Sequence, residues 1–164
     1  MKKEYIYIIG GLILALLLFY KKPIKEGFKN MTRGYRNNNF GNIVKTFSKG
    51  VQTFWTGEIK GNDERFKTFK DADHGYRAIF VLLDSYLKKG RNTIEKIISV
   101  YAPSNENNTK GYIDRVSKLT NLQSDEALTK NDFYKIVLAI SEVENGIKPN
   151  EKDVQNGFKL YQTI

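Results

Sequence analysis

The side chain best placed for chemistry is that of Glu144. It lies at the end of an apolar helical stretch, two positions before Gly146. The stretch carries apolar side chains at helical spacing, at Phe133, Ile136, Val137, Ile140 and Val143. A carboxyl group in the last turn of such a helix is partly desolvated and lies at the negative end of the helix dipole, and both effects raise its pKa. A carboxyl group that keeps its proton near neutral pH can protonate the leaving oxygen of a glycosidic bond.

Helical periodicity alone favours the interpretation that Glu144 is a solvated residue on the polar face of its helix. The sequence around Glu144 favours a catalytic role instead. The segment from Ile136 to Asn150 (IVLAISEVENGIKPN) resembles the catalytic segment of the lytic transglycosylase and goose-type lysozyme families. In those families an apolar helix ends in Glu, followed by a small polar residue, Gly, an apolar residue and often Asn-Pro. Asn145 stands where they usually have Ser, and Lys148 where Asn is common. The resemblance implies that Glu144 is the catalytic general acid/base.

The segment from Arg33 to Ile43 (RGYRNNNFGNI) is similar to the opening of a family of phage structural proteins. That family opens with Arg-Gly-aromatic/aliphatic-Arg-Asn-Asn-Asn-Pro-Gly-Asn-Ile and ends with Glu-Asn-Gly, and here Phe40 replaces the Pro. The similarity covers roughly 33–157, and its further matches are Trp55-Thr56-Gly57, Arg65-Phe66, Phe69, Gly75-Tyr76-Arg77-Ala78, Ala102-Pro103, Glu106-Asn107, Thr109 and Tyr112-Ile113.

The order of these segments differs from that in the lysozyme-like families. There the acid-bearing helix comes early and the substrate-binding loops follow it, whereas here the Asn-rich loop comes first and Glu144 lies near the C-terminus. The Asn-rich stretch, followed by Trp-x-Gly and a Phe-rich strand, also resembles the post-catalytic part of bacterial glucosaminidases. Together the resemblances imply a circularly permuted lysozyme-like domain.

Three acidic residues of the expected hairpin region are candidates for a second carboxylate: Glu58, Asp63 and Glu64. Lysozyme-like folds place a nucleophile or a stabilising carboxylate in this region when they have one. For each of the three taken singly, a solvated turn is the favoured interpretation. Lytic transglycosylases manage with one acid, because the acetamido group of the substrate assists, so the resemblance does not require a second carboxylate.

Amide and aromatic side chains suited to a glycan are grouped in the same part of the chain and just before the Glu144 helix. Amides hydrogen-bond sugar hydroxyl and acetamido groups, and aromatic rings stack on sugar faces. The candidates for substrate binding are Asn37, Asn38, Asn39, Asn42, Trp55, Tyr101 and Tyr112. The alternative is that the amides fix their own loop and the rings belong to the core. We expect no metal and no cofactor, since Cys is absent and His74 is the only histidine.

The elements that must position these side chains are mostly helices. The Asn and Gly content of residues 33–42 indicates an ordered turn or loop, and short apolar runs broken by glycines over 43–69 indicate a small irregular hairpin region. Capping residues, apolar periodicity and Gly or Pro stops predict helices at about 71–89, 92–100, from 109 onward, 130–145 and 154–161. The predicted fold class is mainly α, an α+β lysozyme-like fold with four to five helices.

The N-terminal segment predicts a membrane anchor. Tyr5 to Tyr20 is a run of sixteen residues without a charge, flanked by lysines and Tyr rings that extend its effective length beyond about 24 Å of helix. No small-residue cleavage site follows it, which disfavours a signal peptide. We therefore divide the chain into an N-terminal transmembrane helix (1–22), a basic linker (23–32) and a lysozyme-like domain (33–164). More lysines follow the apolar run than precede it, which favours a domain on the cytoplasmic side of the membrane. Cleavage of the cell wall requires the domain on the opposite side of that membrane. An anchor in a virion membrane would remove this conflict.

The chain is basic, with 27 Lys+Arg against 18 Asp+Glu and a formal net charge of +9. A basic surface attracts polyanions, which include nucleic acid, anionic lipid and the bacterial cell wall. The cationic residues are scattered rather than gathered on one helix, and no nucleic-acid-binding motif occurs, so nucleic acid is the weaker candidate partner.

The sequence therefore predicts a membrane-anchored, peptidoglycan-degrading glycosidase of a phage virion. Its expected partners are glycan strands, a lipid membrane through residues 5–20, and other virion proteins. It is expected in the virion membrane or the bacterial inner membrane, with the domain facing the wall. The alternatives are a non-catalytic lysozyme-like structural protein of a virion and a basic nucleic-acid-binding membrane protein, because a fold can persist after its activity is lost.

Overall fold

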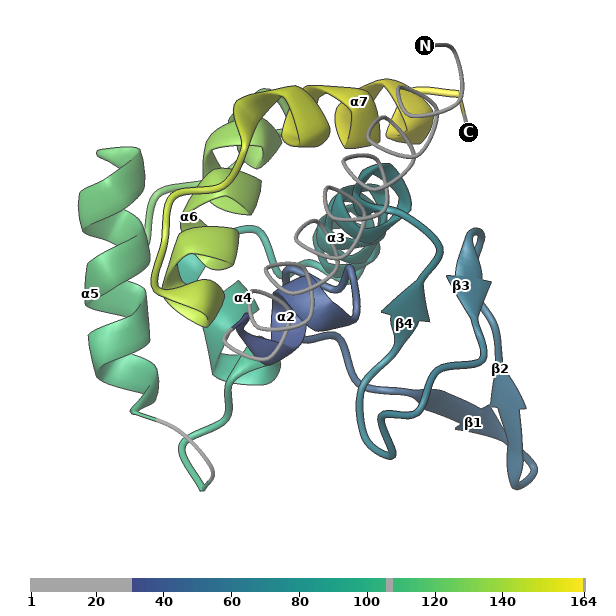
Figure 1. The fold of residues 1–164 in the computed structure, drawn as a ribbon. Coiled ribbons are helices and arrows are strands. Elements are labelled where there is room, and N and C mark those ends of the chain that lie inside the picture. Colours follow the sequence, from purple (N-terminus) through teal and green to yellow (C-terminus); the bar gives the residue numbers. More distant parts are fainter. Residues whose placement is uncertain (1–30, 106–107, 164) are drawn as a thin grey trace, which may run out of the picture. The chain divides into compact units, whose positions relative to one another are not determined.

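Helices make up most of the computed structural model, which describes residues 31–105 and 108–163 (Figure 1). The chain divides into Met1–Thr32 and a compact unit, Arg33–Ile164. The predicted membrane anchor (1–22) and most of the predicted linker (23–32) lie outside the described residues. Within the described ranges, none of the helices has the length and apolar character needed to cross a bilayer.

Several of the helices begin at residues whose side chains cap them. The helical elements are α2 (Arg33–Arg36), α3 (Ala72–Lys88), α4 (Ile94–Tyr101), α5 (Thr109–Thr120), the 3-10 helix η1 (Lys130–Asp132), α6 (Phe133–Asn145) and α7 (Glu151–Tyr161). The side chain of Asp71 accepts a hydrogen bond from the N–H of His74 to start α3, and Thr93 does the same with Lys96 to start α4. The mainly helical α+β architecture predicted from the sequence is confirmed.

Two local predictions need correction. Arg33–Arg36 forms the one-turn helix α2, although Asn and Gly content indicated a loop, because a single turn needs only the bond from the N–H of Asn37 to the carbonyl of Arg33 (3.1 Å). Helix α7 begins at Glu151 rather than Val154, because the side chain of Asn150 accepts a hydrogen bond from the N–H of Lys152 and caps the earlier start.

The expected hairpin region contains two separate two-stranded antiparallel sheets. Strands β1 (Thr46–Ser48) and β2 (Val51–Thr53) pair with Thr46 opposite Thr53, and strands β3 (Glu58–Ile59) and β4 (Thr68–Phe69) pair with Glu58 opposite Phe69. Lys49 and Gly50 connect β1 and β2 with φ of 50° and 80°, the left-handed pair that a tight two-residue hairpin requires.

Helix α6 is the centre of the core, because it contacts α2, α3, α5 and α7. Its buried apolar side chains are Phe133, Ile136, Val137, Ala139 and Ile140. Helix α3 packs along α7, and both contact α6, while α5 packs on α6 and α4. The strands lie to one side of this helical body (Figure 1). Helix α6 thus runs through the core, and the chain becomes exposed at Gly146, directly after its C-terminal end.

Candidate active site

Glu144 lies in the last turn of α6, because Gly146 ends the helix. Gly146 adopts a φ of 70°, and its N–H donates to the carbonyl of Glu142 at 2.8 Å. The turns before Glu144 are fully buried at Ile136 and Ile140, so the carboxyl group stands at the edge of the core. This is the position expected from the sequence for a partly desolvated acid.

Both oxygens of the Glu144 carboxyl group accept hydrogen bonds from side chains of other elements. The amide nitrogen of Asn42 donates to Oε2 at 2.8 Å, and the hydroxyl of Tyr112, on α5, donates to Oε1 at 2.8 Å. These two contacts fix the orientation of the carboxyl plane and tie α6 to the Asn-rich loop and to α5.

Burial raises the pKa of Glu144 above its ordinary value. The hydrogen bonds from Asn42 and Tyr112 favour the carboxylate and lower the pKa in part, but they do not reverse the effect of burial. The carboxyl group is thus biased toward the protonated form that a general acid needs.

Glu144 opens into a cleft of about 800 Å³ between the Asn-rich loop, the first hairpin and α4. Asn42, Trp55 and Tyr101, three of the predicted substrate-binding residues, line this cleft together with Glu144. Its other lining residues are Gly41, Ile43, Val44, Thr46, Arg65, Phe66, Leu82, Tyr86, Val100, Ala102 and Pro103. A cleft of this size, with polar groups at one point of a partly apolar wall, is typical of a binding site.

Two tyrosines lie next to the carboxyl group, and of these Tyr101 lines the cleft whereas Tyr112 does not. The hydroxyl of Tyr101 donates to the carbonyl of Gly41, and the rings of Tyr101 and Tyr112 meet edge-to-face with centroids 6.2 Å apart. Burial, followed by the nearby Glu144 charge, raises the pKa of Tyr101, and burial likewise raises that of Tyr112. Both hydroxyls therefore remain hydrogen-bond donors at neutral pH.

The other three loop asparagines hold the loop itself. Asn37 donates to the carboxylate of Asp63 at 2.9 Å, and Asn38 donates to the carbonyl of Phe69 at 3.1 Å. The fully buried Asn39 donates to the carbonyls of Ile43 and Lys67, both at 2.9 Å. Of the four candidates, only Asn42 lines the cleft.

Asn145 is a site residue that the sequence reasoning did not single out. Its buried amide nitrogen donates to the carbonyls of Phe40 and Ser141, both at 2.9 Å, so the residue after the acid holds the end of α6 on the Asn-rich loop. The signal was present at the sequence level, because Asn145 replaces the Ser usual in the lytic transglycosylase families, but its partner could not be read from the sequence.

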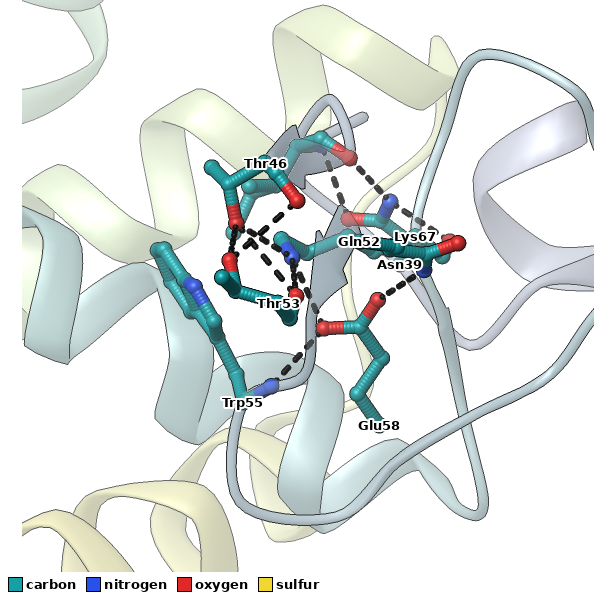
Figure 2. A network of polar contacts seen from close by, with 8 residues as sticks. Asn39, Thr46, Gln52, Thr53, Trp55, Glu58 and Lys67 are labelled. Atoms are coloured by element: carbon teal, nitrogen blue, oxygen red, sulfur yellow. Dashed lines mark hydrogen bonds and ion pairs between the residues drawn. The ribbon is translucent and has the colours of Figure 1, made fainter. Parts of the chain in front are cut away.

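The first candidate for a second carboxylate, Glu58, is fully buried in an ion pair with Lys67 at 2.7 Å (Figure 2). Glu58 also accepts hydrogen bonds from the backbone N–H of Trp55 and from Gln52. The Lys67 ammonium donates to Thr46 and to the carbonyl of Thr53, and it lies 5.0 Å from the centroid of the Trp55 ring. This network places Trp55 on the cleft wall and leaves both Glu58 oxygens occupied.

Asp63 and Glu64, the other two candidates, lie outside the cleft lining. Burial raises the pKa of Asp63, but the N–H groups of Phe66 and Arg65, the Asn37 amide and the Arg33 charge outweigh it and bring the pKa below its ordinary value. Glu64 is exposed. Among the described residues, no three His, Asp or Glu side chains form a group that could hold a metal ion.

The sequence matches no protein-family model. It is 33% identical over 162 residues to protein P5 of Pseudoalteromonas phage PM2, and the alignment covers 97% of each chain. The chain belongs to the family of this phage protein. Because almost the whole of both chains aligns, the similarity includes the N-terminal segment as well as the unit that carries Glu144. The name of protein P5 states no activity.

Proposed function

We propose that this chain is a membrane-anchored, peptidoglycan-degrading protein that cleaves β-1,4 glycan bonds with Glu144 as its single general acid/base. The observation that carries the proposal is the placement of Glu144 in a cleft, with a pKa raised by burial and a carboxyl plane fixed by Asn42 and Tyr112. The resemblance of residues 136–150 to lytic transglycosylases and goose-type lysozymes supports the same role and a permuted lysozyme-like fold.

Glycosidic cleavage by one acid proceeds in two proton transfers. Protonated Glu144 gives its proton to the glycosidic oxygen as the bond from that oxygen to the anomeric carbon breaks, and the bonding electrons stay on the oxygen. The resulting carboxylate then accepts a proton from the hydroxyl that attacks the anomeric carbon, which restores Glu144. The attacking hydroxyl belongs to water in hydrolysis and to the sugar itself in transglycosylation.

A single-acid mechanism agrees with the state of the other carboxylates. Glu58 is neutralised by Lys67, and Asp63 is held by Asn37 and backbone N–H groups, so neither offers a free carboxylate to the cleft. The acetamido group of a peptidoglycan sugar supplies the missing stabilisation in the families that the Glu144 segment resembles. N-acetylated glycan strands are therefore the proposed substrate.

The roles of the remaining cleft residues follow from their chemistry. The Oδ1 atom of Asn42 is buried and accepts no hydrogen bond from the described part of the chain, so it offers an acceptor beside the acid. Trp55 lines the cleft, and Tyr101 lines it beside the Asn-rich loop, where its hydroxyl donates to the carbonyl of Gly41. We assign Asn42 to positioning of the acid and Trp55 and Tyr101 to contacts with sugar rings.

Membership in the family of a phage protein supports a place for this chain in a phage particle. We propose that residues 5–20 anchor it in a membrane and that cleavage opens the wall locally during genome entry. An anchor in the lipid layer of a virion also resolves the conflict between the lysine distribution and the position of the wall.

The test is a clearing assay on purified peptidoglycan with the full chain in detergent. Wild type should clear the substrate, Glu144→Gln should be reduced about 10²-fold or more, and Glu142→Gln should retain activity. Glu142 is the matched control, because it lies on the same helix and pairs with Arg115 at 2.7 Å outside the cleft lining. Equal clearing by wild type and Glu144→Gln would exclude Glu144 as the acid.

A non-catalytic lysozyme-like structural protein is the second candidate. It is favoured by one observation: both oxygens of Glu144 already accept hydrogen bonds from the protein's own side chains, as in a purely structural contact. In that case neither wild type nor the two variants would clear peptidoglycan, and Glu144→Gln would change only the stability of the fold.

A further inference from the structure

The three most exposed large hydrophobic side chains among the described residues all belong to one short segment. Val51 is 69% exposed, Phe47 is 61% exposed and Phe54 is 54% exposed. Phe47 lies on β1, Val51 lies on β2, and Phe54 immediately follows β2. We call these three residues the hairpin patch. Single exposed apolar residues are ordinary, but a group on one projecting element marks an interaction surface.

The hairpin patch is distinct from the cleft. None of its three residues lines the cleft, whose hairpin contacts are made by Val44, Thr46 and Trp55 at the base of the same element. The β1–β2 hairpin points away from the helical body, with its turn farthest from the helices (Figure 1). Phe47 and Val51 occupy neighbouring, non-opposed positions in the β1–β2 register, so they project from opposite faces of the tip. Because the tip carries an exposed apolar side chain on each face, it can insert edge-on into an apolar layer.

The charges around the hairpin patch have one sign at the surface. Lys49 occupies the turn itself and is exposed, and Lys60 is exposed after β3. The only acidic residue between Val44 and Asn62 is Glu58, and its charge is fully buried against Lys67. The hairpin from Lys45 to Phe54 therefore carries apolar and cationic side chains and no acidic one, while Asp63 and the exposed Glu64 lie beside its base and not at its tip.

From this combination we infer that the β1–β2 hairpin docks on an anionic lipid bilayer, with Phe47 and Val51 entering the interfacial region and Lys49 contacting lipid phosphate. Apolar side chains next to lysines are the features that bind such interfaces. The inference concerns the Arg33–Ile164 unit and is independent of cleavage by Glu144. Because Val44, Thr46 and Trp55 are at the base of the same hairpin, docking would hold the cleft close to the bilayer surface.

The chain has no cysteine, so one introduced cysteine carries a fluorophore at a single site. Ser48→Cys places an environment-sensitive dye at the hairpin tip, and Ser99→Cys, exposed on α4, is the matched control position. The labelled full chain is mixed with vesicles of phosphatidylcholine alone, or with roughly one-quarter phosphatidylglycerol. We expect the emission at position 48 to shift to the blue with the anionic vesicles only, and the emission at position 99 to stay unchanged.

Three variants in the Ser48→Cys background separate the contributions. Phe47→Ser combined with Val51→Ser should abolish the blue shift, and Lys49→Gln should reduce the ratio of inserted to free hairpin about fivefold. Ile147→Ser, which removes an exposed apolar side chain elsewhere, should leave the shift intact. Circular dichroism checks that each variant is folded.

The inference is overturned by any of three results: equal shifts at positions 48 and 99, equal shifts with neutral and anionic vesicles, or a shift that survives Phe47→Ser with Val51→Ser. A shift at position 48 that occurs with peptidoglycan sacculi and not with vesicles would also overturn it, and would assign the hairpin to the wall. Concentration-dependent self-association that is lost with the same two substitutions, without a lipid response, would assign it to a second copy of the chain.

Discussion

At the scale of single residues, the proposed chemistry depends on opposing effects on one carboxyl group. Burial at the end of α6 favours the protonated form of Glu144, and donors from Asn42 and Tyr112 favour the carboxylate. A general acid/base must exist in both forms during one catalytic cycle. The two donors therefore keep the carboxylate accessible in a position where burial alone would hold the proton more tightly.

The first prediction concerns Tyr112→Phe. The substitution removes the hydroxyl that donates to Oε1, so it removes support for the carboxylate and should raise the pKa of Glu144 further. The alkaline limb of the pH–activity profile should move to higher pH, and carbon NMR of labelled Glu side chains should report the same direction. Tyr134→Phe is the control, since that hydroxyl contacts the carbonyl of Glu151 instead. An alkaline limb that moves to lower pH would contradict the assignment.

The second prediction concerns stability and pH. The pKa of Glu144 in the folded protein lies above the ordinary value of 4.5, so the folded state binds this proton more tightly than the unfolded state. Its contribution is fully present below that ordinary value and is lost as pH rises through the folded pKa. Glu144→Gln should therefore become more stable relative to wild type as pH is raised from about 4, as measured by urea unfolding at several pH values. A relative stability that falls over this range would contradict the sign.

At the scale of elements, the first hairpin is attached to the second by a buried charge network. Lys67, just before β4, meets Glu58 on β3 and the Thr46 and Thr53 pair on β1 and β2 (Figure 2). Because both charges are fully buried, each depends on the other for its compensation. The network sets the position of Trp55 and hence one wall of the cleft.

The third prediction is that Lys67→Met destabilises the fold by about 3–5 kcal/mol, because it leaves the Glu58 carboxylate buried without its partner. Lys67→Met combined with Glu58→Gln should recover a large part of this loss. Chemical denaturation measures both. Trp55 is the only tryptophan, so its fluorescence also reports whether the cleft wall keeps its environment. Additive losses in the double variant would argue against the pairing.

The fourth prediction concerns the contact between α3 and the Asn-rich loop. A Cβ atom on Gly75 would lie 1.8 Å from the backbone carbonyl oxygen of Asn38, which cannot move as a flexible side chain can. Gly75→Ala should cost about 1–3 kcal/mol of stability and should also lower activity, because the displaced loop carries Asn42. Thermal unfolding and the clearing assay test the two effects. Unchanged stability would show that the loop moves freely.

The elements show which parts of the fold the sequence determines locally. Local signals account for α3, α4 and α6: the Asp71 cap and Gly90 bound α3, the Thr93 cap and Pro103 bound α4, and apolar spacing and Gly146 define α6. The start of α7 and the single turn of α2 were missed, because one Asn cap and one backbone hydrogen bond decide them. The left-handed residues of the Asn-rich loop were anticipated in kind, and Asn38 and Asn42 have φ of 48° and 45°.

At the scale of the whole molecule, the site depends on contacts that sequence patterns do not contain. Asn42 and Glu144 are 102 residues apart, and Tyr112 reaches the same carboxyl group from a third element. The sequence identified Glu144 and the Asn-rich loop separately, and the resemblances implied that both belong to one lysozyme-like domain. Asn42 contacts the Glu144 carboxyl group, whereas the other three asparagines of the loop hold the loop itself. The sequence could not distinguish these roles, because the difference lies in backbone geometry.

Mass spectrometry of fragments released from purified sacculi tests most directly whether Glu144 cuts glycan bonds. We predict disaccharide-peptide fragments with wild type and with Glu142→Gln, and at least about 10²-fold fewer with Glu144→Gln at equal folded concentration. Reducing or anhydro ends on those fragments would identify hydrolysis or transglycosylation. Fragments cut only in the peptide stems, or the same glycan fragments from Glu144→Gln as from wild type, would contradict the account.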